Sequence, residues 1–381
     1  MTRQRLLVLA PTRRAASETF VRANLAGLPF VTTAYFGDER PLTEPRRLAY
    51  GVAVLCSKLL TRLGWLRLAG WPAAVVTRWL IRRHQPDLLL VEFGFHAVRV
   101  MEAAAEADCP LVVHFRGSDL SAWTKFGAQK SRYRRLIRLA SGAIVKSKPM
   151  RRTLLELGLE SDRILISASG ANASLFHSSA PVSAAPVFLA VGRFVAKKGP
   201  LLTIRAFAQL VEQHPSPDLA LWMVGEGPLL HQAQELVQEL GLGSVVRFFG
   251  AQPQQEIAAL MRQVRGFVQH SVVAPDGDSE GNPVAVMEAQ LSGLPVVATC
   301  HAGIPEVVRH GESGWLVAEG DVAGMAAGLY RLVVDPSLAQ RWGQAGRRCI
   351  QERFTIDHHH RDVAQFLRNV PPRFRSQAFA R

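Results

Sequence analysis

Residues 276–305 of the chain read DGDSEGNPVAVMEAQLSGLPVVATCHAGIP. A polar loop opens this stretch, an apolar helical pattern follows over residues 284–292, and a short buried strand is expected at 295–298. Asn282 and Pro283 favour a helix start, with Asn at the N-cap and Pro at the first helical position. A loop, a helix and a buried strand in this order are typical of a parallel α/β sheet.

The same alternation of strand-like and helix-like segments runs through the rest of the chain. Expected strands cover residues 6–10, 88–91, 111–115, 143–145, 187–191, 219–224, 245–248 and 266–269, and expected helices cover 201–214, 229–240 and 254–263. This alternation predicts parallel sheets covered on both faces, which bind ligands at the carboxyl ends of their strands.

The length of 381 residues predicts two domains, because a single core stops growing near ~250 residues. Residues 178–186 (SSAPVSAAP) are small, rich in proline and without periodicity, as in a linker. We therefore expect a first domain over residues 1–180, a second over 181–350, and a C-terminal segment over 351–381 that holds a helix and a basic tail.

Two glycine-containing loops follow expected strands in the second domain. Gly192, Arg193 and Lys198 lie after the strand at 187–191, and a guanidinium fork beside an ammonium suits a diphosphate. Gly225 and Gly227 follow the next strand and permit close approach of the backbone to a ligand. The alternatives are a solvated basic loop and an ordinary strand-to-helix turn.

Two carboxylates flank the start of the helix at 284–292. Glu280 precedes the helix and Glu288 lies about one and a half turns inside it, so the two can hold different parts of one extended ligand. The free amides at the helix start suit phosphate or sugar oxygens. Asp276 with Asp278, and the run 358–360 (HHH), are alternative metal ligands, but the four cysteines lack a zinc spacing and we expect no metal.

These segments, in this order, resemble the C-terminal domain of the retaining glycosyltransferases of family 4. The likeness covers residues 186–350, and residues 276–317 are most similar to the branch that acts in colanic acid and exopolysaccharide synthesis. The resemblance implies the GT-B fold, in which two Rossmann-like, doubly wound parallel-sheet domains face a cleft. It also implies that the last helix crosses back to the first domain.

The resemblance implies a donor site for a UDP- or GDP-linked sugar. Arg193 and Lys198 would bind the diphosphate, Glu280 the transferred sugar and Glu288 the ribose. Other donor-site residues, which would line the sugar, the phosphates and the base, are Gly192, Gly225, Gly227, Gly250, Ala251, Gln252, Gly281, Asn282 and Pro283.

The first half resembles the family less closely. The segment HFRGSD at 114–119 looks like the family's His-Gly-Asp segment, which implies that His114 reaches the donor sugar; the alternative is a core histidine. The resemblance places the acceptor-side contacts at Ser17, Glu18, Thr19 and Asp119. The first loop lacks the family's glycine pair, and residues 169–172 (SGAN) replace its usual Gly-Val-Asp.

The reaction that the resemblance implies is glycosyl transfer with retention of the anomeric configuration. His114, Arg193, Lys198 and Glu280 form the catalytic set, and a donor phosphate oxygen takes the acceptor proton. Cationic side chains neutralise the leaving diphosphate, so we expect neither a cofactor nor a metal. Another chemistry on the same fold, that of an epimerase or a phosphorylase, is the alternative.

The charge is distributed unevenly. Residues 1–180 hold 27 Lys and Arg against 13 Asp and Glu, and residues 181–381 hold 18 of each. Residues 59–83 combine tryptophan, leucine and arginine, and residues 125–138 are dense in cations, as in interfacial segments. We expect a cytoplasmic protein that docks on the anionic inner face of the membrane and takes a lipid-linked or oligosaccharide acceptor. The alternative is a solvated face plus a core helix; nucleic-acid binding is disfavoured because no such motif occurs.

Overall fold

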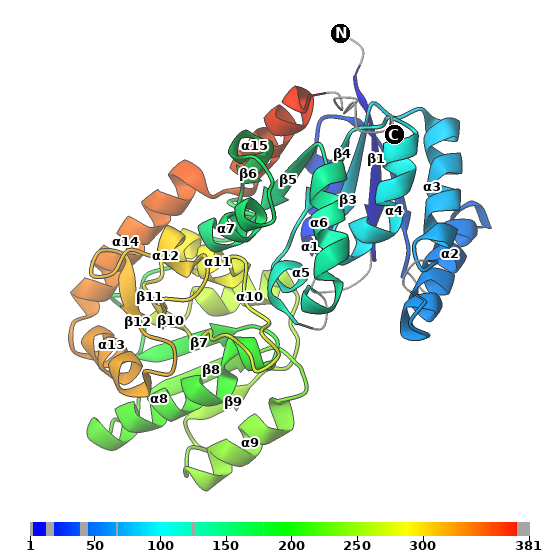
Figure 1. Cartoon of the computed structure of the whole chain (residues 1–381). Coiled ribbons are helices and arrows are strands. Elements are labelled where there is room, and N and C mark those ends of the chain that lie inside the picture. The colour runs from blue at the N-terminus through cyan, green and yellow to red at the C-terminus, as the bar shows by residue number, and fades with distance from the viewer. Residues whose placement is uncertain are drawn as a thin grey trace. The chain divides into compact units, whose positions relative to one another are not determined.

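A computed structural model describes residues 3–12, 19–38, 45–65, 68–123, 126–177 and 179–371 (Figure 1). The chain forms two compact units: unit 1 comprises Met1–Ser167 and His360–Arg381, and unit 2 comprises Ala168–His359. The boundary between the two units after Ser167 therefore lies before the linker expected at residues 178–186. Ala171 explains this, because its amide donates to the Phe354 carbonyl at 3.0 Å and so ties residues 168–177 to unit 2.

Unit 1 contains a six-stranded sheet in the order β2-β1-β3-β4-β5-β6, and all its neighbouring strands are parallel. The strands are β1 (Arg5–Ala10), β2 (Val31–Phe36), β3 (Leu88–Glu92), β4 (Leu111–His114), β5 (Gly142–Val145) and β6 (Ile164–Ile166). Successive side chains of a strand point to opposite faces. In β1, accordingly, Leu7 and Leu9 belong to one apolar cluster, and Leu6 and Val8 belong to another.

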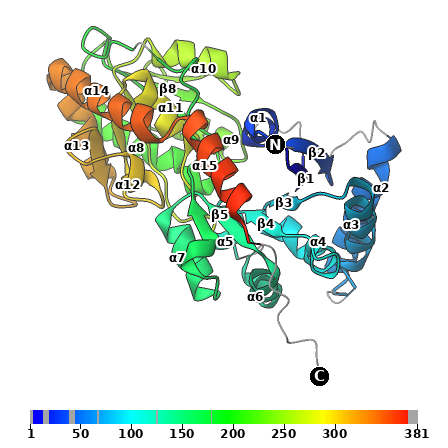
Figure 2. The same cartoon turned by 90° about the horizontal axis from the view of Figure 1, so that it is seen from above.

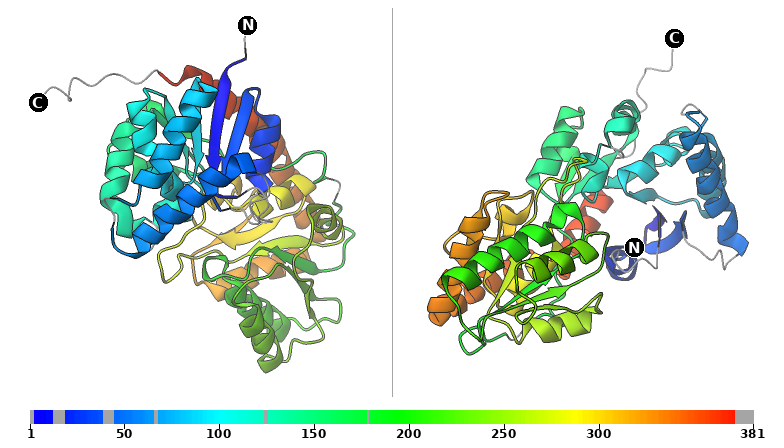
Figure 3. Two further views of the ribbon diagram at one scale, coloured as in Figure 1. Left: turned by 90° about the vertical axis from the view of Figure 1, so that its right-hand side faces the viewer. Right: turned by 90° about the horizontal axis from the view of Figure 1, so that it is seen from below.

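Helices cover both faces of this sheet (Figure 2). They are α1 (Thr19–Gly27), α2 (Pro45–Arg62), α3 (Trp71–His84), α4 (Gly94–Glu106), α5 (Ser118–Ser121), α6 (Lys130–Leu139) and α7 (Lys148–Glu156), with single 3-10 turns at Gly127–Gln129 and Ser161–Arg163. Helices α2 and α3 form a hairpin, and α3 packs on α4 (Figures 2 and 3).

Unit 2 also has a six-stranded parallel sheet, in the order β12-β11-β10-β7-β8-β9. Its strands are β7 (Val187–Val191), β8 (Ala220–Val224), β9 (Val246–Phe248), β10 (Gly266–Gln269), β11 (Val296–Thr299) and β12 (Gly314–Val317). This is the Rossmann order, in which the chain reverses direction across the sheet between β7 and β10. Ligands of such sheets bind outside the carboxyl ends of the strands at that point.

The two faces of the second sheet also carry separate apolar clusters. Phe188 of β7 packs with the cluster of α8 and α13, whereas Leu189 packs with the cluster of α10 and α11. The helices of unit 2 are α8 (Pro200–Gln213), α9 (Leu230–Glu239), α10 (Gln254–Met261), α11 (Val284–Ser292), α12 (Ile304–Val307), α13 (Val322–Val334) and α14 (Pro336–Arg353), with a 3-10 turn, η4, at Ala196–Lys198.

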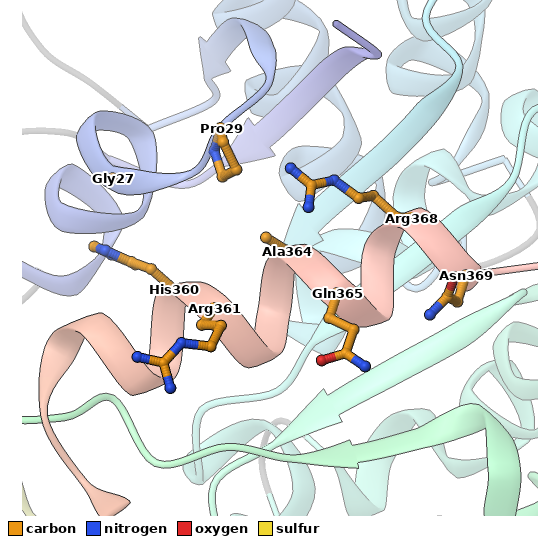
Figure 4. A pocket seen from close by; sticks show the side chains of 8 residues that line it. All are labelled: Gly27, Pro29, His360, Arg361, Ala364, Gln365, Arg368 and Asn369. Atoms are coloured by element: carbon orange, nitrogen blue, oxygen red, sulfur yellow. The ribbon is translucent and has the colours of Figure 1, made fainter. Parts of the chain in front are cut away.

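The last helix, α15 (Ile356–Asn369), begins in unit 2 and continues from His360 as part of unit 1. Val363, Ala364 and Leu367 are buried against strands of the first sheet. In Figure 4, His360 points toward the end of α1, where a Cβ on Gly27 would overlap the imidazole. The small residue at position 27 therefore lets α15 pack closely on unit 1.

Candidate functional site

The loop after β7 lies at the reversal point of the second sheet. It contains η4 and ends at Gly199, whose φ of +52° and closeness to the His270 carbonyl leave no room for a Cβ. Lys197 fixes it further, because its carbonyl accepts from the Val272 amide at 3.0 Å. The loop is therefore held at the carboxyl end of β10.

The glycines after β8 bring a second loop to the same place. Gly225 and Gly227 have φ values of +139° and +155°, and a Cβ on either would overlap a carbonyl, that of Gly192 or that of Phe194. The loop after β9 joins them, because the Gly225 amide donates to the Gly250 carbonyl at 2.7 Å. The observed reason for Gly225 and Gly227 is thus contact between loops.

Residues 250–252, predicted near the base, form part of this edge. The Gln252 side chain donates to the Phe249 carbonyl at 2.6 Å and so stabilises the turn itself. The predicted donor residues after β7, β8 and β9 therefore lie on adjoining loops at one edge of the sheet.

Two cations of the first loop line one small hollow at this edge. Arg193 and Lys198 both face it, together with Thr203 and Gln269. Arg193 is exposed, whereas the Lys198 ammonium lies 3.4 Å from Glu280 Oε1. The adjacent Lys197 is buried and bonded to Asp278 at 3.1 Å, which leaves Arg193 and Lys198 as the cations of the hollow.

The pairing of Lys198 with Glu280 changes both side chains. Burial lowers the pKa of Lys198, and Glu280 opposes that shift. Burial alone would raise the pKa of Glu280, but Lys198 and Lys197 hold that pKa below its ordinary value. Glu280 is therefore an ionised carboxylate next to a partly desolvated ammonium.

His301, whose role no local sequence motif indicates, holds the Glu280 loop in place. It follows β11, and its Nε2 accepts from the Glu280 amide at 3.1 Å and lies 3.0 Å from Ser279 Oγ. The other ring nitrogen, Nδ1, lies 2.6 Å from Glu319 Oε1. Because Nε2 is an acceptor, Nδ1 carries the proton and donates it to Glu319.

Helix α11 covers the predicted residues 284–292, but its N-cap lies one residue later than predicted. Pro283 occupies the N-cap position and the helix begins at Val284, so Asn282 is not the N-cap. The extended backbone of Pro283 (ψ 119°) accounts for the difference. Asn282 is 8% exposed and its Oδ1 accepts no hydrogen bond from the described residues, while the Gly281 carbonyl accepts from the Gly303 amide at 3.1 Å.

Glu288 lies inside α11 and is buried. Burial raises its pKa to about 7, although Gln254, which donates to Glu288 Oε1 at 3.0 Å, acts in the opposite direction. A carboxyl group with this pKa changes its charge near neutral pH. Glu280 and Glu288 therefore differ in ionisation although both flank the start of one helix.

The corresponding edge of unit 1 holds a closed charge network. His114 ends β4 with no exposed surface, and its Nδ1 lies 3.4 Å from Oε1 of Glu92, which ends β3. The Arg116 guanidinium reaches Glu92 Oε2 at 2.6 Å and, together with His114, holds the pKa of Glu92 well below its usual range despite burial. Burial keeps the pKa of His114 well below its ordinary value, so the ring is neutral at pH 7.

Asp119 stabilises this edge through hydrogen bonds from backbone amides. Its carboxylate is fully buried and accepts from the amides of Gly94 at 2.8 Å and of Arg116 and Gly117 at 2.9 Å each. It thus holds two loops together and has no surface for an acceptor. Of the other acceptor-side residues, Ser17 and Glu18 lie outside the described residues, and Thr19 opens α1 without a described side chain.

The carboxylates weighed as metal ligands have other partners. Asp278 binds Lys197, and Asp276 Oδ1 accepts from the Asp278 amide at 3.0 Å. Among the described residues, no three His, Cys, Asp or Glu side chains gather around a point that could hold a metal ion.

Comparison with known proteins assigns the family. Residues 174–349 match the model described as "Glycosyl transferases group 1", and residues 8–170 match the "Glycosyl transferase 4-like domain". The amylovoran biosynthesis glycosyltransferase AmsK of Erwinia amylovora is 30% identical over 289 residues, which cover 74% of this chain and 70% of AmsK. The chain therefore belongs to the family of glycosyltransferases that these models and AmsK represent.

A second relative matches over a shorter segment. The putative colanic acid biosynthesis glycosyltransferase WcaL of Salmonella typhimurium is 33% identical over 217 residues, which cover 56% of this chain and 53% of WcaL. The chain thus spans about half the length of this relative. Both relatives are named for exopolysaccharides, in agreement with the branch predicted from residues 276–317.

Solved structures confirm the predicted fold class. Anabaena HepE in complex with UDP has a TM-score of 0.74 at 19% identity, covering 96% of this chain and 99% of that chain. Sucrose-phosphate synthase of Thermosynechococcus elongatus has a TM-score of 0.72 at 18% identity, with 96% and 98% covered. The glycosyltransferase therefore has the two Rossmann-like parallel-sheet domains of the GT-B fold.

Proposed function

We propose that the protein is a retaining hexosyltransferase that moves a sugar from a UDP- or GDP-sugar to a lipid-linked saccharide in exopolysaccharide or other cell-surface glycan synthesis. The observation that carries this proposal is the hollow at the reversal point of the second sheet, which Arg193 and Lys198 line and beside which Lys198 pairs with Glu280. Preorganised cations at this position stabilise the charge that a leaving diphosphate acquires.

The donor enters this hollow with its diphosphate toward Lys198 and Arg193. Binding of the phosphates replaces Glu280 as the partner of Lys198 and frees the Glu280 carboxylate to accept from sugar hydroxyls. The buried Oδ1 of Asn282 is a further acceptor for a sugar hydroxyl, since a buried acceptor without a donor is costly. Glu288, in its ionised form, accepts from the ribose hydroxyls, and residues 250–252 lie against the base.

The transfer breaks the bond between the anomeric carbon and the diphosphate oxygen. A bond from the acceptor hydroxyl forms on the same face of the sugar, and the hydroxyl proton passes to a donor phosphate oxygen. The nucleoside diphosphate leaves with the charge that Arg193 and Lys198 neutralise, so the reaction needs no metal and no cofactor. On the family resemblance, His114 is proposed to contact a hydroxyl of the donor sugar through a neutral imidazole.

The relatives support the substrate classes in this proposal. AmsK is named for amylovoran synthesis and WcaL for colanic acid synthesis, and HepE has been solved in complex with UDP-glucose. Ser17, Glu18 and Thr19 are proposed to contact the acceptor. We further propose that the protein works at the inner face of the cell membrane, where lipid-linked acceptors are found; the described residues contain no helix long and apolar enough to span a bilayer.

Thermal unfolding in the presence of a panel of UDP- and GDP-sugars tests the donor. A ligand that binds only the folded protein raises the melting temperature by mass action. One nucleotide series should raise it, and the matching nucleoside monophosphate should do so less because it lacks the second phosphate. Absence of any shift with either series contradicts the proposal. Proton NMR of the product then tests retention: an anomeric configuration opposite to that of the donor excludes the proposed mechanism.

A further inference from the structure

The turn between α2 and α3 exposes a dense group of large apolar side chains. Five residues are more than half exposed: Leu59 (57%), Leu63 (58%), Trp65 (59%), Leu68 (54%) and Trp71 (65%). We call these five residues the hairpin tip. Large apolar side chains are normally buried. Five of them exposed around one short turn therefore indicate a surface that a partner or a membrane covers.

The hairpin is already packed on unit 1 through other residues. Tyr50 and Val54 of α2 are buried in the core, and Tyr50 Oη lies 2.6 Å from His96 Nε2. The exposed apolar side chains thus form a second face. On α2 they follow helical spacing at Leu48, Val52, Leu55 and Leu59, and on α3 at Trp71, Val75 and Trp79; Leu63 lies just past the end of α2.

The charge of the hairpin identifies the kind of partner. Residues 45–86 contain eight Lys and Arg and no Asp or Glu. A second copy of this chain docked on the same face would bring these cations together, because a two-fold contact uses the same surface twice. Tryptophan and leucine flanked by Lys and Arg match the interface of an anionic bilayer, where aromatic rings lie at headgroup level.

The position of the tip relates it to the edge of the first sheet. Asp38 follows the carboxyl end of β2, and its Oδ1 accepts from the Lys58 ammonium at 2.6 Å. Lys58 immediately precedes the tip residue Leu59, so the tip lies on the side of unit 1 where the strands end. His114 ends β4 at that same edge.

The second basic segment lacks such a face. In α6, Tyr133, Leu136 and Ile137 have 2% exposure or less and belong to the core, so its surface offers charge alone. Of the two segments predicted to meet the membrane, one is therefore able to insert.

We propose that the hairpin tip inserts into the interface of an anionic bilayer through Trp65 and Trp71, with Arg62, the exposed cation that ends α2 beside the tip, on the lipid phosphates. This brings the strand ends of unit 1 to the membrane surface. The inference rests on the proposed function only in that a lipid-linked acceptor gives the docking a purpose; the docking itself does not depend on the donor.

The test is co-sedimentation with phosphatidylcholine vesicles that do or do not contain phosphatidylglycerol, at low and high salt. The full chain should bind the anionic vesicles at low salt. Trp65→Ser combined with Trp71→Ser should reduce the partition coefficient roughly tenfold or more, because two apolar rings no longer leave water. Arg62→Gln, which removes the exposed cation at the end of α2 beside the tip, should reduce binding less and weaken its dependence on salt.

The matched control is Trp123→Ser, since Trp123 is 66% exposed in unit 1 but lies outside the hairpin. It should bind vesicles like the wild type, and all variants should keep the wild-type melting temperature because the changed side chains are exposed. Equal losses for Trp123→Ser and the double variant overturn the proposal, as does wild-type binding by the double variant. So does a dimer in lipid-free buffer, seen by analytical ultracentrifugation, that the double substitution abolishes.

Donor-induced thermal shifts separate this test from that of the proposed function. The double variant should give the same shift with the nucleotide sugar as the wild type. Vesicle binding without any donor shift leaves the membrane proposal standing and removes the proposed UDP- or GDP-sugar donor, and a donor shift without vesicle binding does the reverse.

Discussion

The carboxyl edges of the two sheets hold their charged side chains in contrasting ways. In unit 2, Arg193 is exposed and lines a small hollow together with Lys198, whose carboxylate partner is Glu280. In unit 1, the side chains of Glu92 and His114 have 1% exposure or less, and the Glu92 carboxylate pairs with the Arg116 guanidinium.

This difference indicates that the charged side chains of unit 2 bind a ligand, whereas those of the buried unit 1 network hold the structure in place. A charge at an accessible hollow can change its partner when a ligand arrives, whereas removing one member of a buried network leaves another charge without compensation. Substitutions of Glu92 and Arg116 should therefore reduce stability, and those of Arg193 and Lys198 should reduce turnover.

The largest expected effect is that of Glu92→Ala in unit 1. The substitution leaves the buried Arg116 guanidinium without its carboxylate, and the free energy of unfolding should fall by about 3–5 kcal/mol. Urea denaturation measures the change. Glu106→Ala is the matched control, because Glu106 pairs with Arg78 while 53% exposed, and its cost should stay within about 0.5 kcal/mol. Similar losses in both variants would break the contrast.

Next in size is the effect of Lys198→Ala in unit 2. Turnover at saturating donor should fall by about 10²–10³-fold, as for loss of one preorganised contact to developing charge. The free energy of unfolding should change less than in Glu92→Ala, because Lys197 remains beside Glu280. Arg205→Ala, an exposed cation on α8, should keep wild-type turnover. A Lys198→Ala protein that turns over normally would remove this residue from the catalytic set.

The smallest expected effect is the pH dependence caused by Glu288. Its pKa of about 7 means that the ionised form needed for the ribose becomes dominant only above neutral pH. Donor affinity should rise roughly tenfold per pH unit below pH 7, about 1.4 kcal/mol, and level off above it. Calorimetric titration across this range should show a flat profile for Glu288→Gln. A slope retained in that variant would assign the titration to another group.

Stability gives an independent check on Glu288. The folded protein holds a proton on Glu288 between its unfolded pKa near 4.5 and its folded pKa near 7, whereas the unfolded chain has lost it. Stability therefore falls as pH rises through this window, and Glu288→Gln should not show this decrease.

Sequence patterns predicted the central strands and missed three strands at sheet edges. Strand β7 and helix α11 have the predicted bounds, because both are apolar runs closed by glycine or proline. The missed strands β2, β6 and β12 each lie at one edge of a sheet. An edge strand is covered on fewer sides, so its sequence is less apolar; in β2 (VTTAYF) four of six residues are partly or fully exposed.

The residues of the site likewise differ in whether a local sequence motif reveals them. Lys198, Glu280 and Glu288 are recognisable because each lies in a local motif beside glycine or proline. His301 and Glu92 are not, since their roles depend on partners 18 to 24 residues away, such as Glu319 and Arg116. The one local sign for Glu92 is an acidic residue at the end of an otherwise apolar strand, LLLVE. The hairpin was equally ambiguous, because both faces of α2 carry apolar residues and only packing shows which is covered.

Helix α15 has a consequence for the order in which the chain matures during synthesis. Unit 1 starts first, yet Val363, Ala364 and Leu367, which cover Leu6, Val8 and Leu90, leave the ribosome after all of unit 2. Until then one face of the first sheet lacks its cover, and such transiently exposed apolar surface attracts chaperones or aggregates. Unit 1, although translated first, is therefore the last to complete its apolar core.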